Sequence, residues 1–475
     1  MRNRGKVIVS FLLGVVLTLA LSLFYLAPHR LRTIVSPNNI GEIGAIEDVF
    51  QRLRASHFFY EGDDRSLING AIEGMVNALG DPHSSFFTLQ DFDNFASGLR
   101  DSFYGIGAEV NSINGNAVIV APFPGSPAEE AGLMPNDIVV TVDGEEVSGR
   151  SLQEVISLIR GPEGTEVVMG VRRDNNPELV YVVPIRGRIP QESVRSQLKV
   201  VEDVSVGYVQ VLTFGEATAR EFEAAITELE AQGIEGLIVD LRNNSGGYLR
   251  AVIEMVDFLL PEGEVITSVV DRDGRGDTFM TSNNTAGKDF SIVTLINGGS
   301  ASASEIFAAA MKEAADQEVI GTASFGKGTV QVSLPLDDAH VLKITSQIWR
   351  TSAGNWINEE GVQPTQLVED PDFYFFPQII VPEGTEIVFD TVSPVVMNAQ
   401  NTLITLGYKE ERNDGYFDQA TVEAVEAFQV ANGLAVTGTL NSETATALTM
   451  ALRDKIRDPQ FDIQLQTALE FLSQG

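Results

Sequence analysis

A run of 21 residues without a charge, Val7–Ala27, is the feature that most limits how this chain can fold. A helix of that length measures about 31 Å, which matches the hydrocarbon thickness of a bilayer. A cleaved signal peptide would have a shorter apolar core and a small-x-small cleavage site, whereas this run ends in Phe24-Tyr25-Leu26-Ala27-Pro28. The sequence therefore predicts an uncleaved signal anchor within residues 1–35, with a cleaved signal peptide as the alternative.

Basic residues flank both ends of this run almost equally, so the positive-inside rule gives a slight bias. They are Arg2, Arg4 and Lys6 before it, and Arg30 and Arg32 after it. We expect the N-terminus to stay in the cytoplasm. The sequence thus predicts a single-pass protein of the cell membrane, with residues 36–475 outside the cytoplasm, on the periplasmic or cell-wall side.

The composition excludes several classes of function. The chain has 66 acidic and 32 basic residues, a net charge of −34, which excludes nucleic acid as a partner because phosphate binding needs a stripe of Lys and Arg. It has no cysteine, so disulfides, Cys-ligated zinc and a Cys nucleophile are excluded together. It has four histidines and no HExxH, and we predict neither a metal nor a cofactor.

Residues 36–100 are predicted to be helical. Apolar residues recur at helical spacing in two runs, and the second run stops at Gly80-Asp81-Pro82. The first run is Ile43, Ile46, Val49, Phe50 and Leu53, and the second is Leu67, Ile68, Ala71, Met75 and Leu79.

Residues 101–188 change to short β-rich runs punctuated by turns. An Asn-Gly hairpin is predicted at Ile113–Asn116 and a helix at Ser151–Arg160. The segment GSPAEEAGLMPNDIVVTVDGEEV (125–147) resembles the PDZ domains of proteases. Tyr104-Gly105-Ile106-Gly107 matches their carboxylate-binding loop, whose glycines let backbone N–H groups converge on a peptide C-terminus. The following strand edge can accept an extended peptide.

Residues 189–375 are predicted to form a mixed, mostly parallel α/β layer. GLIVDLR (236–242) and SIVTLIN (291–297) are near-continuous apolar strands, typical of strands buried on both faces. Each is followed by a glycine-containing turn, and an alanine-rich helix begins near residue 302. Sites are expected at the carboxyl ends of such strands.

Residues 385–455 are predicted to form a small three-helix module, followed by a C-terminal tail at 456–475. The module resembles the peptidoglycan-binding module in Leu406-Gly407-Tyr408, Asp414-Gly415, Phe428-Gln429 and Thr437-Gly438. This resemblance implies peptidoglycan as a partner. A helical cap without a ligand is the alternative.

A serine that follows a predicted buried strand, together with a lysine further along the chain, indicates the kind of catalysis. No G-x-S-x-G is present, and position alone leaves Ser300 and Ser302 as candidates. Lys327 has glycine on both sides, which suits a cramped site. To act as a base near pH 7, a lysine must lose about 3.4 pKa units, roughly 4.6 kcal/mol, through burial. A Ser/Lys dyad is therefore chemically plausible without histidine.

Two alternatives compete with this dyad. Ser324-Phe325-Gly326-Lys327 reads as S-x-x-K, but that motif requires a helix, which the two glycines disfavour, and no K-T-G follows. His340, beside Asp337 and Asp338, is a distant candidate base.

At this point the chain resembles the carboxyl-terminal processing peptidases, a serine-lysine family also called tail-specific proteases. NGGSASASEI (297–306), FGKGTVQ (325–331), DLRNNSGG (240–247) and GVQPT (361–365) match segments of that family. The resemblance implies that Ser302 is the nucleophile, that Lys327 is the general base and that Gln331 orients the lysine.

The same resemblance implies an oxyanion hole made by Gly246 and the backbone N–H of Ala303. It places supporting polar residues at Asp240, Arg242 and Glu305, for which a purely structural ion-pair role is the alternative. Ser245 and Thr365 stand where the family commonly has proline and aspartate; neither change removes a catalytic group.

The predicted fold is therefore an α/β multidomain chain: membrane helix, helical segment, PDZ domain, mixed α/β protease core and small three-helix module. The predicted function is a membrane-anchored serine endopeptidase that recognises the free C-termini of protein or peptide substrates and cleaves through an acyl-enzyme. The alternative is a non-catalytic PDZ and peptidoglycan-binding scaffold with an inactive core. A retinoid- or tricorn-type relative is a third interpretation, although propeller repeats are absent from the sequence.

Overall fold

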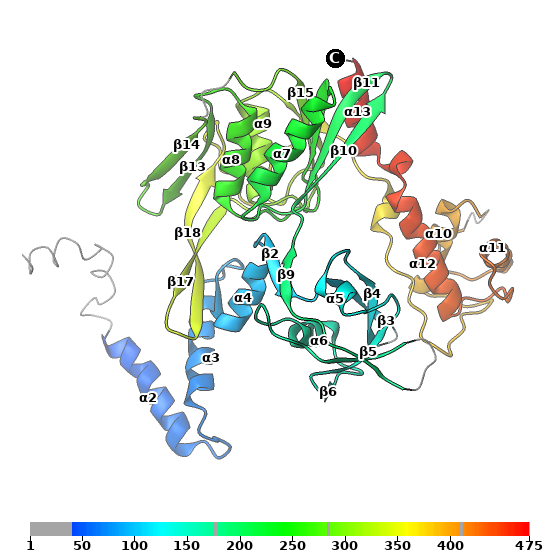
Figure 1. The fold of residues 1–475 in the computed structure, drawn as a ribbon, viewed down its shortest axis with the longest axis horizontal. Coiled ribbons are helices and arrows are strands. Elements are labelled where there is room, and N and C mark those ends of the chain that lie inside the picture. The colour runs from blue at the N-terminus through cyan, green and yellow to red at the C-terminus, as the bar shows by residue number, and fades with distance from the viewer. Residues whose placement is uncertain (1–39, 114, 174–177, 283–285, 409–411, 475) are drawn as a thin grey trace, which may run out of the picture. The chain divides into compact units, whose positions relative to one another are not determined.

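The computed structural model describes residues 40–113, 115–173, 178–282, 286–408 and 412–474. The chain divides into two compact units, Met1–Phe86 and Phe87–Gly475 (Figure 1). The predicted membrane span Val7–Ala27 lies outside the described residues. Within the described ranges, none of the helices combines the length and the apolar character needed to cross a bilayer.

In its described residues, from 40 onward, the first unit contains two helices, as the apolar spacing predicts. They are α2 (Ile40–Ser56) and α3 (Asp64–Asn77), and the Asp63 carboxylate caps α3 by accepting a hydrogen bond from Ser66 N–H at 3.0 Å. Val76 is buried, whereas large apolar side chains such as Ile43 and Met75 remain exposed. Strand β1 (Ser85–Thr88) crosses the boundary, and α4 (Leu89–Ser97) opens the second unit.

The second unit begins with a small antiparallel domain where the sequence predicts a PDZ fold. Its main sheet has the order β3-β4-β5-β7-β8, with β6 on β5, and β2 pairs separately with β9. Ile113 pairs with Asn116, so the predicted hairpin is confirmed, and α6 begins at a capping box between Ser151 and Glu154. The elements are β2 (Ser102–Gly105), β3 (Ala108–Ile113), β4 (Asn116–Pro122), α5 (Pro127–Glu130), β5 (Ile138–Val142), β6 (Glu145–Glu146), α6 (Leu152–Ile159), β7 (Met169–Arg172), β8 (Val180–Val182) and β9 (Gly187–Pro190).

The central layer is a six-stranded sheet in the order β10-β11-β12-β15-β16-β19, parallel except for the β10–β11 pair. The predicted mixed, mostly parallel sheet is confirmed, and every residue of β12 is buried. The strands are β10 (Val194–Val201), β11 (Val204–Val211), β12 (Gly236–Asp240), β15 (Ser291–Ile296), β16 (Glu318–Gly321) and β19 (Gln366–Leu367).

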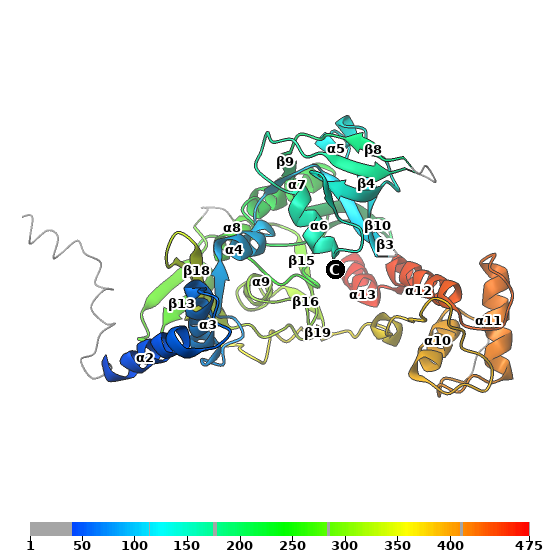
Figure 2. The ribbon, with the colours of Figure 1, turned by 90° about the horizontal axis from the view of Figure 1, so that it is seen from below.

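Helices cover both faces of this sheet. On one face, Phe222 of α7 (Thr218–Ala231), Met255 of α8 (Leu249–Leu259) and Phe307 of α9 (Ala303–Glu313) pack into one core. On the other face lies α13 (Ile463–Gln474), and Figure 2 shows α9 and α13 at the strands β15 and β16. This two-sided cover explains the continuous apolar strands, because both faces exclude water.

A second, antiparallel sheet stands beside the central one. It includes the strands β17 (Thr329–Pro335), β18 (His340–Arg350), β13 (Val265–Asp271) and β14 (Gly276–Met280), which follow one another in that order. The sequence predicts TVQVSLPL (329–336) and HVLKITSQIWR (340–350) as further strands of the mixed layer, and not as a separate sheet. The four residues between β17 and β18 can join only antiparallel neighbours, because a parallel pair needs a long crossover.

The helical module consists of α10 (Pro394–Thr405), α11 (Gln419–Ala431) and α12 (Ser442–Arg457), and its core includes Leu403, Phe428 and Leu448. The three predicted helices are confirmed. Short helical turns flank the module at η2 (Asp372–Phe375) and η3 (Pro459–Phe461). The predicted tail at 456–475 contains η3 and α13, whose apolar spacing lets it pack on the central sheet.

Candidate active site

Ser302 lies at the sharp turn from β15 into α9. Its backbone angles are φ 55° and ψ −110°, a left-handed conformation that is rare for a residue with a side chain. Such a backbone costs on the order of 1–3 kcal/mol and persists only where the surroundings enforce it. The geometry resembles the strained strand-to-helix turn of G-x-S-x-G hydrolases, although that motif is absent here.

The two candidate serines occupy different environments. Ser300 is completely buried, and its hydroxyl donates to the Leu241 carbonyl at 2.8 Å and accepts from Asn297 N–H at 3.0 Å. Ser302 is partly exposed. Ser300 therefore ties the turn to the end of β12, which leaves Ser302 as the serine that a substrate can reach.

Gly246 approaches the Ser302 turn very closely. A Cβ at Gly246, whose φ is 99°, would lie 2.9 Å from the Cβ of Ser302 and 2.9 Å from the Ala303 nitrogen. The Gly246 N–H donates to Asn244 Oδ1 at 2.9 Å. The Ala303 N–H, at the first residue of α9, has no acceptor among the described residues. The two predicted oxyanion-hole positions thus lie side by side at Ser302.

Asn244 fixes the loop that carries Gly246, a role that is not predicted from the sequence. Its side chain donates to the Val211 carbonyl at 2.7 Å while accepting from Gly246. Its own carbonyl accepts from Ala301 N–H at 3.0 Å and from the Ser304 hydroxyl at 2.8 Å. An Asn in a strand-to-glycine loop is a common turn residue, so the sequence offers no specific signal for this role.

Glu305 joins the serine segment to the lysine segment. Its carboxylate is fully buried, and Oε2 accepts from Ser302 N–H at 2.7 Å and from Lys327 N–H at 2.8 Å. The other oxygen, Oε1, accepts from Gly326 N–H and from the Ser324 hydroxyl, both at 2.6 Å. Because one oxygen atom binds both backbone nitrogens, Ser302 and Lys327 are held within a few ångströms of each other.

The lysine segment is a non-helical loop. Residues 323–328 form no helix, so the S-x-x-K geometry is absent, and the Ser324 hydroxyl is bound to Glu305. The Lys327 carbonyl accepts from Trp349 Nε1 at 2.8 Å, and the Gly328 carbonyl accepts from Trp356 Nε1 at 3.0 Å. Two tryptophans thus hold the two consecutive carbonyl groups that follow the Cα of Lys327.

Gln331 lies in β17, four residues after the lysine. Its Nε2 donates to the Thr329 hydroxyl at 3.0 Å and to the Thr345 hydroxyl of β18 at 3.1 Å. Both threonines therefore set the orientation of the amide, with its nitrogen turned toward them.

His340 lies far from the lysine along the second sheet. Its Nδ1 is 2.9 Å from Asp337 Oδ1, and hydrogen bonding to His340 lowers the pKa of the Asp337 carboxyl. Thr329 pairs with Ile348 at the other end of β18, eight residues from His340, which is roughly 26 Å along a strand. This placement separates His340 from the Ser302 turn.

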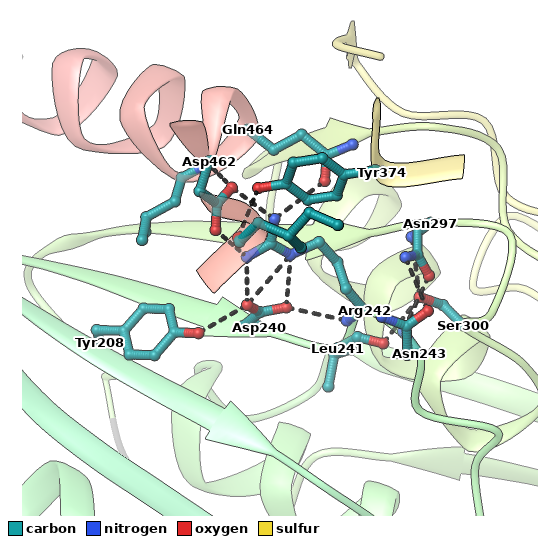
Figure 3. A network of polar contacts seen from close by, with 12 residues as sticks. Tyr208, Asp240, Leu241, Arg242, Asn243, Asn297, Ser300, Tyr374, Asp462 and Gln464 are labelled. Carbon is teal, nitrogen blue, oxygen red and sulfur yellow. Dashed lines mark hydrogen bonds and ion pairs between the residues drawn. The ribbon is translucent and has the colours of Figure 1, made fainter. Parts of the chain in front are cut away.

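Asp240 and Arg242 belong to a buried ion cluster at the end of β12 (Figure 3). Arg242 binds Asp240 at 2.7 Å through Nη2 and reaches Asp462 at 2.7 Å through Nη1. Burial lowers the pKa of the Arg242 guanidinium, but hydrogen bonds and charges from Asp462 and Asp240 outweigh it and raise that pKa overall. Tyr208, whose hydroxyl donates to Asp240 Oδ2, has its pKa raised by burial and by the Asp240 charge.

A small apolar pocket of about 90 Å³ lies at the predicted carboxylate-binding loop of the small antiparallel domain. Gly105, Ile106 and Gly107 line it, as predicted, whereas Tyr104 is absent from its wall and is half exposed in β2. The rest of the lining comes mainly from the strand that follows the loop and from the predicted Ser151–Arg160 helix, which the sequence places as the other wall of the groove. It comprises Phe103, Ala108, Val110, Ile156, Ile159 and Arg160.

No group of three or more His, Asp or Glu side chains suited to a metal ion occurs in the described part of the chain. The site therefore consists of a strained serine, a nearby lysine backbone and two closely placed N–H groups. These are the groups that a serine hydrolase uses, and here they occur in a chain that also contains a peptide-binding domain.

Comparisons with known proteins agree with that class. The chain matches "Peptidase family S41" over residues 205–368, "PDZ domain" over 118–173 and "Putative peptidoglycan binding domain" over 392–448. It is 38% identical over 427 residues to the carboxy-terminal processing protease CtpB of Bacillus subtilis, covering 90% of this chain and 88% of that protein. It is 37% identical to the B. subtilis protease CtpA, covering 88% and 87%.

Among solved structures, the photosystem II D1 C-terminal processing protease is 28% identical, with a TM-score of 0.43, covering 70% of this chain and 94% of that one. The chain belongs to peptidase family S41, among the carboxy-terminal processing proteases. The predicted family, with its PDZ and peptidoglycan-binding domains, is thereby confirmed.

Proposed function

We propose that this protein is a serine endopeptidase that works through a Ser302/Lys327 dyad and an acyl-enzyme. The observation that carries the proposal is the Glu305 carboxylate, one oxygen of which binds the backbone nitrogens of both residues. Burying a charge is costly unless several donors compensate it, and the donors that compensate Glu305 include the backbone N–H groups of both Ser302 and Lys327. Here the carboxylate assembles the serine and lysine segments into one site.

In the proposed reaction, neutral Lys327 takes the proton from the Ser302 hydroxyl while Oγ attacks the carbonyl carbon of the scissile bond. The Ala303 N–H, which has no acceptor among the described residues, donates to the developing oxyanion. The Gly246 N–H joins it by exchanging its bond to Asn244 Oδ1 for one to the oxyanion. Lys327 then passes its proton to the leaving amine, and a water molecule hydrolyses the acyl-enzyme with Lys327 again as the base.

Gln331 is proposed to orient Lys327. Its Nε2 is engaged by Thr329 and Thr345, which directs the amide oxygen away from both hydroxyls. That oxygen can accept a hydrogen bond from the lysine amine and align its lone pair with the serine proton.

Substrate recognition is proposed to begin in the pocket at Gly105, Ile106 and Gly107. Backbone N–H groups of this loop would bind the terminal carboxylate of a substrate, and the apolar lining would take its last side chain. The helical module is proposed to bind peptidoglycan, in keeping with the domain that it matches.

Membrane anchoring by Val7–Ala27, with the catalytic part outside the cytoplasm, is also proposed, on the length of the charge-free run. Protease added to intact cells, after removal of any wall, should digest the catalytic part. Digestion that occurs only after lysis would contradict this topology.

The dyad is tested with purified Ser302→Ala, Lys327→Met and Lys327→Arg variants on a peptide with a free C-terminus. All three should lose turnover while keeping peptide binding, since methionine cannot take a proton and arginine stays protonated. His340→Ala is the matched control and should retain most activity. Activity of the wild type should rise with pH through an apparent pKa well below the ~10.4 of a free lysine.

Near wild-type cleavage by Lys327→Arg would refute the dyad and redirect attention to His340. If no condition gives cleavage by the wild type while peptide and peptidoglycan binding persist, the scaffold alternative is correct instead.

A further inference from the structure

The segment that follows the helical module returns to the protease core. Four apolar residues of α13 pack on the central sheet against side chains that include Val206 and Val293. A Cβ on Gly236 of β12 would lie 3.0 Å from Leu472, so the fit is close. The four α13 residues are Leu465, Ala468, Leu469 and Leu472.

Arg242 connects this helix to the end of β12. Its guanidinium binds two carboxylates at once: Nε and Nη2 bind Asp240, and Nη1 and Nη2 bind Asp462 at 2.7 and 2.8 Å. Asp462 also caps α13, because its Oδ1 accepts from Leu465 N–H at 3.0 Å. The Arg242 side chain is 13% exposed, so water competes little with these bonds.

Arg242 stands directly before the loop that carries Gly246. The neighbouring Leu241 carbonyl accepts the Ser300 hydroxyl, and Arg242 N–H donates to Asp240 Oδ1 at 3.0 Å. The loop itself contains Asn243 at φ 58° and Gly246 at φ 99°. A positive φ is uncommon for a residue with a side chain, so the loop depends on its anchors to hold Asn243 in this conformation.

We infer that Asp462, from the far end of the chain, is a positioning residue for the oxyanion loop, and that it acts through Arg242. Asp462 touches neither the serine nor the lysine. It fixes the guanidinium, the guanidinium fixes the end of β12, and the end of β12 sets where the Gly246 N–H lies relative to Ser302. The inference rests on the proposed function, because it assumes an oxyanion at that N–H.

The test is the Asp462→Asn variant in the full chain. Asparagine caps a helix as well as aspartate does, so α13 should stay docked, and Arg242 keeps Asp240 as a counter-ion. One carboxylate oxygen and the charge are lost, so the guanidinium is held less firmly. We expect kcat to fall about 10- to 100-fold with KM unchanged within roughly 2-fold, because an oxyanion hole acts in the transition state.

A second readout isolates the oxyanion hole. Ser302 Oγ adds to the carbonyl carbon of a peptide aldehyde, its proton passes to Lys327, and the aldehyde oxygen becomes an oxyanion in the hole. The affinity for the aldehyde should fall by the same factor as kcat. The affinity for the corresponding product peptide, which forms no oxyanion, should stay unchanged.

Two matched controls separate positioning from folding. Asp458→Asn changes an acid of the same segment whose carboxylate binds Gln460 and not Arg242, and it should leave kcat unchanged. Leu469→Ala loosens the packing of α13 while the ion pair is kept, so it should lower the melting temperature with little effect on kcat below it. If Leu469→Ala and Asp462→Asn lower kcat equally, helix docking is what matters and the inference is overturned.

Unchanged kcat and aldehyde affinity in Asp462→Asn would also overturn it. Failure of the proposed function gives a different result: Ser302→Ala would then remain active. An inactive Ser302→Ala together with a fully active Asp462→Asn removes the positioning role alone.

Discussion

Among single residues, Glu305 has the most demanding position. An ionised carboxylate in a protein interior is tolerated when its oxygens are fully hydrogen-bonded. Glu305 accepts four hydrogen bonds, two at each oxygen, and it stands in the first turn of α9, where the helix dipole favours a negative charge. The charge is therefore stabilised by the very groups that it positions.

Replacing Glu305 with glutamine should be strongly destabilising. The amide nitrogen cannot accept, so two of the four donors would face another donor and remain unsatisfied, at about 1–3 kcal/mol each. We expect thermal unfolding to show a loss of roughly 2–5 kcal/mol, with a large fall in kcat for the protein that remains folded. Glu313→Gln, at the other end of α9, is the control, because Glu313 binds surface groups such as Ala353 N–H. A variant with wild-type stability and kcat would show that Glu305 is not the link we describe.

The residues of the candidate site differ in how far the sequence predicts them. Position alone leaves Ser300 and Ser302 open, and the roles of Ser302 and Lys327 are predicted from short segments that resemble the family. The backbone of Ser302 could not be predicted, since its left-handed conformation is imposed by contacts with Gly246 and Glu305 from elsewhere in the chain. For Asp240 and Arg242, the sequence does not decide between a supporting role near the catalytic residues and a purely structural ion pair. The two hydrogen bonds from Arg242 to Asp462, the residue that caps α13, are not indicated by any local pattern.

At the scale of elements, the predictions succeed where periodicity is strong. The buried strands β12 and β15 and the hairpin of β3 and β4 follow from apolar runs and an Asn-Gly turn. The assembly of β17 and β18 into a second sheet depends on which partners they meet, and their own pattern does not contain that information. Helix α13 did have a signal, because Leu465, Leu469 and Leu472 recur at helical spacing.

The segment between β19 and η2 contains a testable weak point, Asp370. Its Oδ1 is buried without a hydrogen-bond partner among the described residues, and burial raises the pKa of the carboxyl, as do the charges of Asp462 and Asp240. A raised folded-state pKa favours folding below the unfolded pKa, and that benefit is lost as the pH rises through the folded pKa. At neutral pH the ionised Asp370 therefore lowers stability.

Asp370→Asn should accordingly raise the free energy of unfolding at pH 7 by roughly 0.5 kcal/mol, a small value because solvent screens a partly exposed charge. The gain should shrink as the pH falls toward 4, where the wild type becomes protonated. Thermal unfolding measured from pH 4 to 8 checks this, with the exposed Asp372→Asn as the control. A gain that stays constant with pH would show that the charge is not its cause.

For the whole molecule, we expect two domains to share the reaction. The PDZ domain should bind the C-terminus of the substrate, and the protease core should cleave the peptide bond. If the loop at Gly105 and Gly107 binds a terminal carboxylate, amidation of the peptide should weaken binding by about 1.5–3 kcal/mol through loss of a charge-assisted hydrogen bond. Calorimetry on Ser302→Ala with free and amidated peptides measures this without turnover. A peptide of scrambled C-terminal sequence controls for non-specific binding, and equal affinity for the free and amidated forms would contradict carboxylate recognition.

The position of α13 also sets an order of events during synthesis. The helix is translated after the module, yet it covers a sheet whose strands left the ribosome long before. Until residue 474 is available, one apolar face of that sheet has no cover and Arg242 has no Asp462. Since domains otherwise fold as the chain emerges, the module can fold first as a loop tethered at both ends. A nascent protease of this design would complete its central core only after α13 has been translated, which delays proteolysis until that helix is available.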